Sequence, residues 1–211
     1  MSKPDLMPLA EEERADLLAL LRELTPAQWE AQSLCTEWRI RDVATHVVSY
    51  DELSKAATVA TFVRGGLRIG KVNDIALSRY RGLDPAGIID LVARNQRPNG
   101  LPSGFMGGIA LTDGTIHHQD IRRALGLPRV IPEHRLVSVL SFWLGAPTLP
   151  SKGNAKGLRL VATDVDWTAG DGPEVTGPGE AILMAAAGRT EALDDLSGDG
   201  LVMLRKRVGR R

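Results

Sequence analysis

Three side chains in the sequence have the types and spacing that suit a metal site. Asp113 and His117 are four residues apart in the segment Asp113-Gly-Thr-Ile-His117-His-Gln-Asp120. On a helix, side chains at i and i+4 lie on one face with Cβ atoms about 5 to 6 Å apart, so this carboxylate and imidazole can bind one ion. His46 is the third candidate if the fold brings it opposite the pair. Two histidines and one carboxylate leave coordination positions open, which suits catalysis better than a structural role.

The two histidine assignments have plainer alternatives. His46 lies on the apolar face of a predicted helix, between Val43 and Tyr50, where a lone histidine is usually a core residue. His118 competes with His117 for the ligand position, but it lies about 100° further round the helix. The two neighbours therefore cannot face the same core, and we choose His117 because it shares its face with the two nearby aspartates.

Asp120 and Cys35 can each take a functional or a structural role. Asp120 is one turn from His117, where it can support that ligand as a partner of the imidazole or instead form an ion pair with Arg122 or Arg123. Cys35 precedes a predicted helix, where a thiolate nucleophile would gain from the helix dipole, but single cysteines are more often small buried apolar side chains. A single cysteine excludes an internal disulfide framework and any zinc site with several cysteines.

Composition and charge limit the classes of partner. Of 211 residues, 43% are apolar and 25% are charged, which is a globular balance for one large domain or two small ones. The 26 basic and 26 acidic side chains cancel, so the basic excess of a general nucleic-acid binder is missing. No apolar run approaches the roughly 18 to 20 residues that span a bilayer, and residues 1–5 lead into an acidic stretch. We therefore expect a cytoplasmic protein without a signal peptide, a nucleic-acid partner or a membrane partner.

The first two thirds of the chain have apolar side chains at helical spacing, with signals for where helices begin and end. Thr25, Pro26 and Gln28 suit an N-cap, a first-turn proline and the end of a capping box. Gly65-Gly66 suits the end of a helix, and the Gly- and Pro-rich residues 98–108 suit a loop. We predict helices over residues 17–24, a short segment from 26, 39–63, 85–97, 109–125 and 132–143.

The composition changes after a linker-like stretch at residues 147–157. Beyond it, short alternating segments and turn signals favour strands mixed with one helix. We predict a strand at 158–162, a hairpin of 165–168 with 174–176, a helix at 178–187 and a last strand at 201–204. The predicted fold class is therefore α+β, with a helical domain over residues 1–150 and a small α/β domain over residues 151–211.

Three segments together resemble one known family. The segment Leu34-Cys-Thr-Glu-Trp38-Arg-Ile-Arg-Asp42-Val-Ala-Thr-His46 resembles the N-terminal signature of the mycothiol-dependent maleylpyruvate isomerase family, which belongs to the DinB-like metalloenzyme superfamily. Residues 113–126 resemble its second metal motif, and residues 175–189 followed by 196–200 resemble its small second domain. Each motif is short, but their order and spacing together are specific, and the resemblance covers most of the chain.

The resemblance implies a DinB-like bundle of four main helices that holds a divalent metal, usually zinc. His46 and His117 match the family's histidine ligands, and Asp113 stands where the isomerase has a glutamate, whose side chain is one methylene longer. The family's second domain also supplies an arginine to the substrate. Arg205 is the candidate here, with Arg189 as the alternative, although Arg189 also suits a cation at a helix end.

The same resemblance implies a reaction with a low-molecular-weight thiol, mycothiol. A metal lowers the pKa of a bound thiol, and the thiolate would add to an electrophilic small molecule in an S-transferase or cis–trans isomerase reaction. Two alternatives stay open: a non-catalytic module that contains the metal and binds a small molecule or protein, and a hydrolase in which the same open site activates water. The sequence identifies neither the substrate nor the metal.

Overall fold

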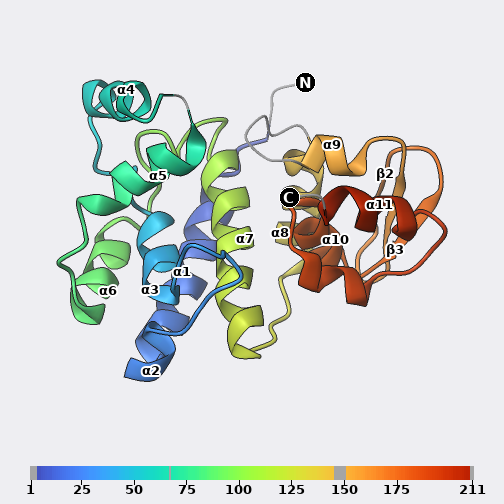
Figure 1. Ribbon diagram of the computed structural model, residues 1–211, viewed down its shortest axis with the longest axis horizontal. Helices are drawn as coiled ribbons and strands as arrows, with labels where there is room; N and C mark the ends of the chain where they lie inside the picture. Colours follow the sequence, from blue (N-terminus) through green and yellow to red (C-terminus); the bar gives the residue numbers. More distant parts are fainter. Residues whose placement is uncertain (1–3, 67, 145–150, 210–211) are drawn as a thin grey trace. The chain divides into compact units, whose positions relative to one another are not determined.

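The computed structural model describes residues 4–66, 68–144 and 151–209, and contacts divide the chain into two compact units, Met1–Pro128 and Arg129–Arg211. Helices form most of the first unit, and a three-stranded sheet with helices forms the second (Figure 1). The predicted α+β fold class is confirmed. No helix within the described ranges has both the length and the apolar character needed to cross a membrane.

Four helices of the first unit pack around one apolar core. The helices of this unit are α1 (Met7–Glu23), α2 (Pro26–Trp29), α3 (Ile40–His46), α4 (Lys55–Arg64), α5 (Ile69–Ser78), α6 (Pro85–Arg94) and α7 (Gly108–Leu125). Helices α1, α3, α6 and α7 bury side chains such as Leu21, Val43, Leu91 and Ile121 against one another. Helices α4 and α5 lie at one end of this bundle (Figure 1). The bundle places α3 beside α7, the two helices that carry the predicted metal ligands.

The predicted single helix over residues 39–63 is wrong, because it is broken after His46. Residues 47–54 form turns in which backbone bonds such as Ser49 N–H to the His46 carbonyl span three residues instead of four. The Ser54 hydroxyl then caps α4 by accepting a bond from the Ala57 amide at 3.2 Å. The apolar spacing correctly indicated burial through this segment, but burial also suits a turn that is held inside the core. Helix α5 was not predicted.

Local capping signals gave the more accurate boundaries. The Thr25 hydroxyl accepts from the Gln28 amide and the Gln28 side chain accepts from the Thr25 amide, so the predicted capping box is confirmed. Helix α7 begins after Gly107, which has φ 86° and whose missing Cβ would lie 2.7 Å from Met7 Cα. A glycine is required there on both counts, because that φ is left-handed and the neighbouring backbone leaves no room.

The second unit holds a small mixed sheet. Its elements are α8 (Glu133–Trp143), α9 (Ser151–Ala155), β1 (Arg159–Ala162), β2 (Thr168–Ala169), β3 (Glu174–Gly177), α10 (Gly179–Ala186), the 3-10 helix η1 (Thr190–Asp195) and α11 (Leu201–Val208). The strand order is β2-β1-β3, with β1 antiparallel to β2 and parallel to β3. The buried helix α10 packs on β1, β3 and α8.

Two predictions for the second unit are wrong. The expected hairpin of 165–168 with 174–176 does not form, because β2 and β3 each pair with β1 and not with each other. The expected strand at 201–204 is the first half of α11, whose buried residues Leu204 and Val208 have the four-residue spacing of a helix face. Helix α8 packs with α10, and the contacts divide the chain between Pro128 and Arg129. The predicted linker at 147–157 lies partly outside the described residues, and Ser151–Ala155 within it form α9.

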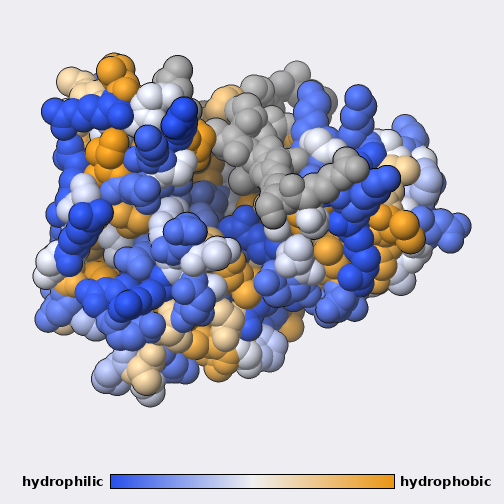
Figure 2. Space-filling view, viewed as in Figure 1, coloured by the Kyte–Doolittle hydropathy of each residue, from blue (hydrophilic) through white to orange (hydrophobic). Residues whose placement is uncertain are grey.

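Apolar side chains are also exposed on the first unit. On the face seen in Figure 2, they gather over the α4 and α5 region, where Val59, Val63 and Ile69 are exposed. These side chains belong to the end of the bundle formed by α4 and α5 and are not part of the core cluster that supports α3 and α7.

Candidate metal centre

The fold brings all three predicted ligands together. His46 is the last residue of α3, and Asp113 and His117 lie one turn apart on α7. The Asp113 Oδ1 atom lies 3.5 Å from Nε2 of His117 and 3.8 Å from Nε2 of His46, and the three candidate ligand atoms all lie within 4.8 Å of one another. The helical spacing therefore places the carboxylate beside one imidazole, and the packing of α3 on α7 adds the second.

The separations suit a metal ion better than a hydrogen-bonded cluster. Contacts of 3.5 and 3.8 Å are too long for hydrogen bonds between these groups. Two ligand atoms that each lie about 2.1 Å from a tetrahedral zinc ion are about 3.4 Å apart. His46 and His117 are buried, while the Asp113 side chain is 37% exposed. The set consequently fits one divalent ion with an open side at Asp113.

Charge within the cluster is unevenly shared. Burial lowers the pKa of His46 below its ordinary value and outweighs the attraction of Asp113. Burial also opposes the charged form of His117, but Asp113 and Asp120 raise the pKa of this imidazole well above its ordinary value. Burial alone would raise the pKa of Asp113, yet the two histidines lower it well below the usual range. Because a ligating imidazole must be neutral, a metal cation bound at this cluster would compete with a proton for His117.

Aromatic rings hold His46 in place. The Trp38 ring lies 4.6 Å from the His46 ring and 5.9 Å from the His117 ring, centroid to centroid, and Tyr50 meets His46 edge-on at 6.2 Å. Within the described part of the chain, the buried Nδ1 atom of His46 has no hydrogen-bond partner. His46 is therefore positioned by packing. Trp38 was not predicted as a site residue, although it lies inside the segment 34–46 that resembles the family signature.

Hydrogen bonds hold His117 in place. Its Nδ1 atom lies 2.9 Å from Asp120 Oδ2, so the predicted support of His117 by Asp120 exists in the structure. The Cys35 thiol donates to the same Oδ2 atom at 3.1 Å, and its sulfur lies 3.8 Å from His117 Nδ1. Cys35 was predicted to be a nucleophile or a core residue, and its contact with Asp120 was not predicted, because only the fold forms it.

His118 is directed away from the cluster. It is fully buried, its Nδ1 atom lies 2.8 Å from Glu13 Oε1, and Arg122 donates to its Nε2 atom at 2.9 Å. Nδ1 thus joins α7 to α1, and Nε2 is engaged by the next turn of α7 itself. The choice of His117 over His118 as the residue facing Asp113 and His46 agrees with the structure.

Arg205 lies on α11 in the second unit. Its guanidinium donates to the Leu193 carbonyl at 3.0 Å and to Asp194 Oδ1 at 2.9 Å, and about half of the side chain is exposed. The alternative residue, Arg189, donates to the Ala187 carbonyl at 3.1 Å, close to the end of α10. The role of Arg205 toward a substrate stays a prediction.

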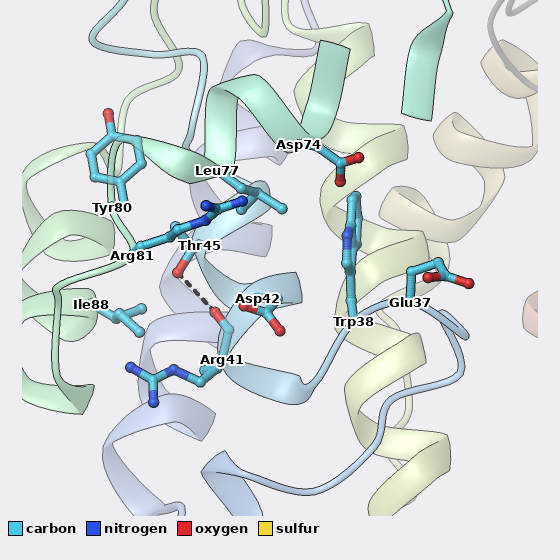
Figure 3. A pocket seen from close by; sticks show the side chains of 10 residues that line it. All are labelled: Glu37, Trp38, Arg41, Asp42, Thr45, Asp74, Leu77, Tyr80, Arg81 and Ile88. Carbon is cyan, nitrogen blue, oxygen red and sulfur yellow. Dashed lines mark hydrogen bonds between the residues drawn. The ribbon is translucent and has the colours of Figure 1, made fainter. Parts of the chain in front are cut away.

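A pocket of about 290 Å³ adjoins the aromatic support of the cluster. Figure 3 shows Glu37 and Trp38 on the loop before α3, and Asp74 and Leu77 on α5. Its lining residues are Glu37, Trp38, Arg41, Asp42, Thr45, Asp74, Leu77, Tyr80, Arg81 and Ile88. None of the three candidate metal ligands is among these described lining residues. Trp38 joins the pocket to the histidines, since it lines the pocket and packs on both rings.

The comparisons with known proteins point to one fold. Residues 10–97 match the family described as the mycothiol maleylpyruvate isomerase N-terminal domain, a range that includes His46 and ends before α7. The crystal structure of the mycothiol-dependent maleylpyruvate isomerase has a TM-score of 0.53 and 16% sequence identity, over 94% of this chain and 93% of that chain. A crystal structure of a histidine-to-alanine mutant of the isomerase has a TM-score of 0.51, with the same identity and coverage. No curated protein matches in sequence.

The structural likeness extends over both units, whereas the sequence match covers the first part of the helical unit. At 16% identity, the likeness to the solved structures establishes the fold. The predicted resemblance is confirmed: the chain has the fold of the mycothiol-dependent maleylpyruvate isomerase, and its residues 10–97 match the mycothiol maleylpyruvate isomerase N-terminal domain family.

Proposed function

We propose that this chain is a metal-dependent enzyme that activates a low-molecular-weight thiol, mycothiol, for addition to an electrophilic small molecule, as an S-transferase or a cis–trans isomerase. The observation that carries the proposal is the convergence of His46 Nε2, Asp113 Oδ1 and His117 Nε2 at one open, partly buried point. The family of residues 10–97 supports mycothiol as the thiol.

His46, Asp113 and His117 would hold the divalent ion, and two nitrogens with one oxygen suit zinc among several metals. When bound, the ion would supply the positive charge that stabilises a thiolate at neutral pH. Asp113 offsets part of that charge, and its exposed side admits the thiol and the electrophile. Trp38 and Tyr50 shield the histidines from water on the buried side.

We assign Arg205 to a substrate carboxylate, if the electrophile carries one. A guanidinium can form two parallel hydrogen bonds with a carboxylate, and these charge-assisted bonds give orientation as well as affinity. The Leu193 carbonyl and Asp194 already orient the guanidinium of Arg205, and the exposed half of its side chain supports access by a ligand.

Metal content is the direct test. Purified wild-type protein, His46→Ala, His117→Ala and His134→Ala are compared by elemental mass spectrometry, with the exposed His134 in the second unit as the matched control. We expect about one divalent ion per chain in the wild type and in the control, and almost none in the two ligand variants. Conjugation of mycothiol to a panel of electrophiles should then follow metal content.

Two results would contradict this proposal. A wild-type protein that takes up no divalent ion after incubation with zinc would favour the binding-module alternative. A metal-loaded protein that hydrolyses esters or amides but transfers no thiol would favour the hydrolase alternative.

A further inference from the structure

The two histidines of the cluster are supported by one turn of the chain, residues 35–38. The Trp38 amide donates to the Cys35 carbonyl at 2.9 Å, which closes the turn. The first residue of the turn contacts Asp120, and the last one packs on His46 and His117. The amide of the preceding Leu34 donates to the Asp120 carbonyl at 3.3 Å, which fastens the turn to α7.

A chain of two hydrogen bonds leads from the Cys35 thiol through Asp120 to His117. Asp120 is fully buried, and its Oδ2 atom accepts both from the Cys35 thiol and from His117 Nδ1. A carboxylate oxygen only accepts, so the proton of this bond is on Nδ1 of His117. The Nε2 atom, which faces Asp113 and His46, is then left with its lone pair in the neutral ring.

We propose that Cys35 is a positioning residue, whose thiol holds the Asp120 carboxylate in the orientation that keeps the proton on Nδ1 of His117 and leaves Nε2 for a metal ion. The inference rests on the metal function proposed above, but its first test needs no metal. It gives Cys35 a role other than ligand or nucleophile. The second partner of a ligating imidazole sets its tautomer and ring orientation, and its loss typically weakens metal binding about 10- to 100-fold.

The thiol matters because a buried carboxylate can rotate. Asp120 offers two oxygens, and a second donor on Oδ2 favours the rotamer in which that oxygen faces His117. The position of the thiol is itself set by the turn: the Ser33 hydroxyl accepts from the Cys35 amide at 3.0 Å and donates to the Trp38 carbonyl at 2.7 Å. The turn therefore sets the position of the Cys35 thiol, the thiol sets the orientation of the Asp120 carboxylate, and the carboxylate orients His117.

The first experiment measures the tautomer of His117 in metal-free protein by imidazole ¹⁵N NMR, at a pH above the titration of the ring. We expect the Nδ1–H tautomer in the wild type and a raised Nε2–H population in Asp120→Asn, because the new amide can donate to Nδ1. Cys35→Val removes the donor at similar volume and should give a smaller change in the same direction. Cys35→Ser keeps a donor and should match the wild type. If Cys35→Val does not fold, Cys35→Ala takes its place.

The second experiment measures zinc affinity by competition with a chelator, in a buffer without thiols. We expect Asp120→Asn to bind zinc about 10- to 100-fold more weakly. Cys35→Val should lose about twofold to tenfold, the usual worth of one hydrogen bond, and Cys35→Ser should recover most of it. Glu13→Gln is the matched control. It removes a carboxylate on α1 that faces His118, the neighbour of His117 on α7, and it should leave zinc affinity and the His117 tautomer unchanged.

Distinct outcomes overturn the two proposals. A wild type that binds no zinc but has the expected tautomers would refute the metal function and leave the positioning chain standing. An Nε2–H tautomer in the wild type, or an unchanged tautomer in Cys35→Val, would overturn the role of Cys35. A sulfur-to-cobalt charge-transfer band in thiol-free, cobalt-loaded protein would also overturn it, because Cys35 would then be a ligand.

Discussion

Two adjacent histidines on α7 belong to two different kinds of buried polar cluster. His118 lies in a closed cluster in which short contacts of 2.8 and 2.9 Å, to Glu13 and from Arg122, use both ring nitrogens. His117 lies in an open cluster: one nitrogen is bonded to Asp120, and the other faces Asp113 at 3.5 Å, too far for a hydrogen bond. Burial and charge are thus common to both histidines, and the difference between them is that Nε2 of His117 faces a carboxylate across a distance too long for a hydrogen bond.

A second closed pair extends the comparison. Arg14 and Asp51 are almost fully buried and form two hydrogen bonds of 2.8 and 2.9 Å, and Arg14 also donates to the carbonyls of Val47 and Asn95. This pair ties α1 to the turn that follows α3. Burial raises the pKa of Asp51, although Arg14 and the Asn99 amide oppose that shift. Such ion pairs with short contacts hold the bundle together, whereas the open cluster has groups available for a ligand.

The largest expected effect on function comes from removing His117 from the open cluster. His117→Ala should reduce metal content from about one ion per chain to almost none and abolish metal-dependent thiol transfer, because two ligands cannot retain the ion. Elemental analysis and a thiol-conjugation assay measure both. In the metal-free state this variant should still fold, as circular dichroism would show; a variant that retains its metal would remove His117 from the ligand set.

The largest expected effect on stability comes from removing one partner of the buried Arg14–Asp51 ion pair. Arg14→Leu leaves Asp51 buried without its cationic partner and should lower the free energy of unfolding by about 3 to 5 kcal/mol. Denaturant titration of metal-free protein measures this loss. The folded fraction should still bind zinc with wild-type affinity, since neither residue belongs to the open cluster. A weakened zinc affinity would show that the two clusters are coupled.

The ligand competition predicts a pH effect confined to the open cluster. The pKa of His117 is raised, so a proton competes with the metal from a higher pH than at an ordinary histidine. Apparent zinc affinity should fall by about tenfold for each unit that the pH drops below that pKa, because one proton must be released for each ion bound. Isothermal titration in buffers of different ionisation enthalpy would count the released protons. A pH-independent affinity would contradict the competition.

The aromatic support should give a smaller loss. Trp38→Leu keeps an apolar side chain but removes the ring that packs 4.6 Å from His46, whose Nδ1 atom lacks a hydrogen-bond partner among the described residues. We expect zinc affinity to fall by about tenfold, the lower end of the effect of losing a group that orients a ligand. Trp29→Leu, on a core tryptophan outside the cluster, serves as the control for the loss of a buried indole.

The smallest expected effect concerns the carboxylate itself. Asp113→Glu restores the longer side chain that the resemblance places at this position, and either length can reach an ion between the two histidines. Zinc affinity should change by less than about tenfold, while Asp113→Asn should lose much more because the amide lacks the charge. Chelator competition on the two variants decides whether charge or length matters at the open side.

The sequence was most informative where the signal is local. The four-residue spacing of Asp113 and His117 depends only on the helix, and α7 forms where the pattern predicts it. The capping box at Thr25 is equally local. Prediction was weakest where the spacing of apolar residues is compatible with two local structures. Apolar spacing after His46 suited both a continuous helix and a buried turn, and residues 201–204 suited both a strand and a helix.

The sequence by itself determined the α+β class, the pair of candidate ligands on one helix turn and the resemblance to the mycothiol-dependent maleylpyruvate isomerase family, because helical periodicity and short motifs lie within a few residues. The tertiary structure alone decided that His46 meets that pair, that Cys35 contacts Asp120, and that His118 faces Glu13. Each of these contacts joins residues separated by 67 or more positions, as 46 from 113, 35 from 120 and 13 from 118. Only the packing of α1, α3 and the turn 35–38 against α7 brings such residues within reach.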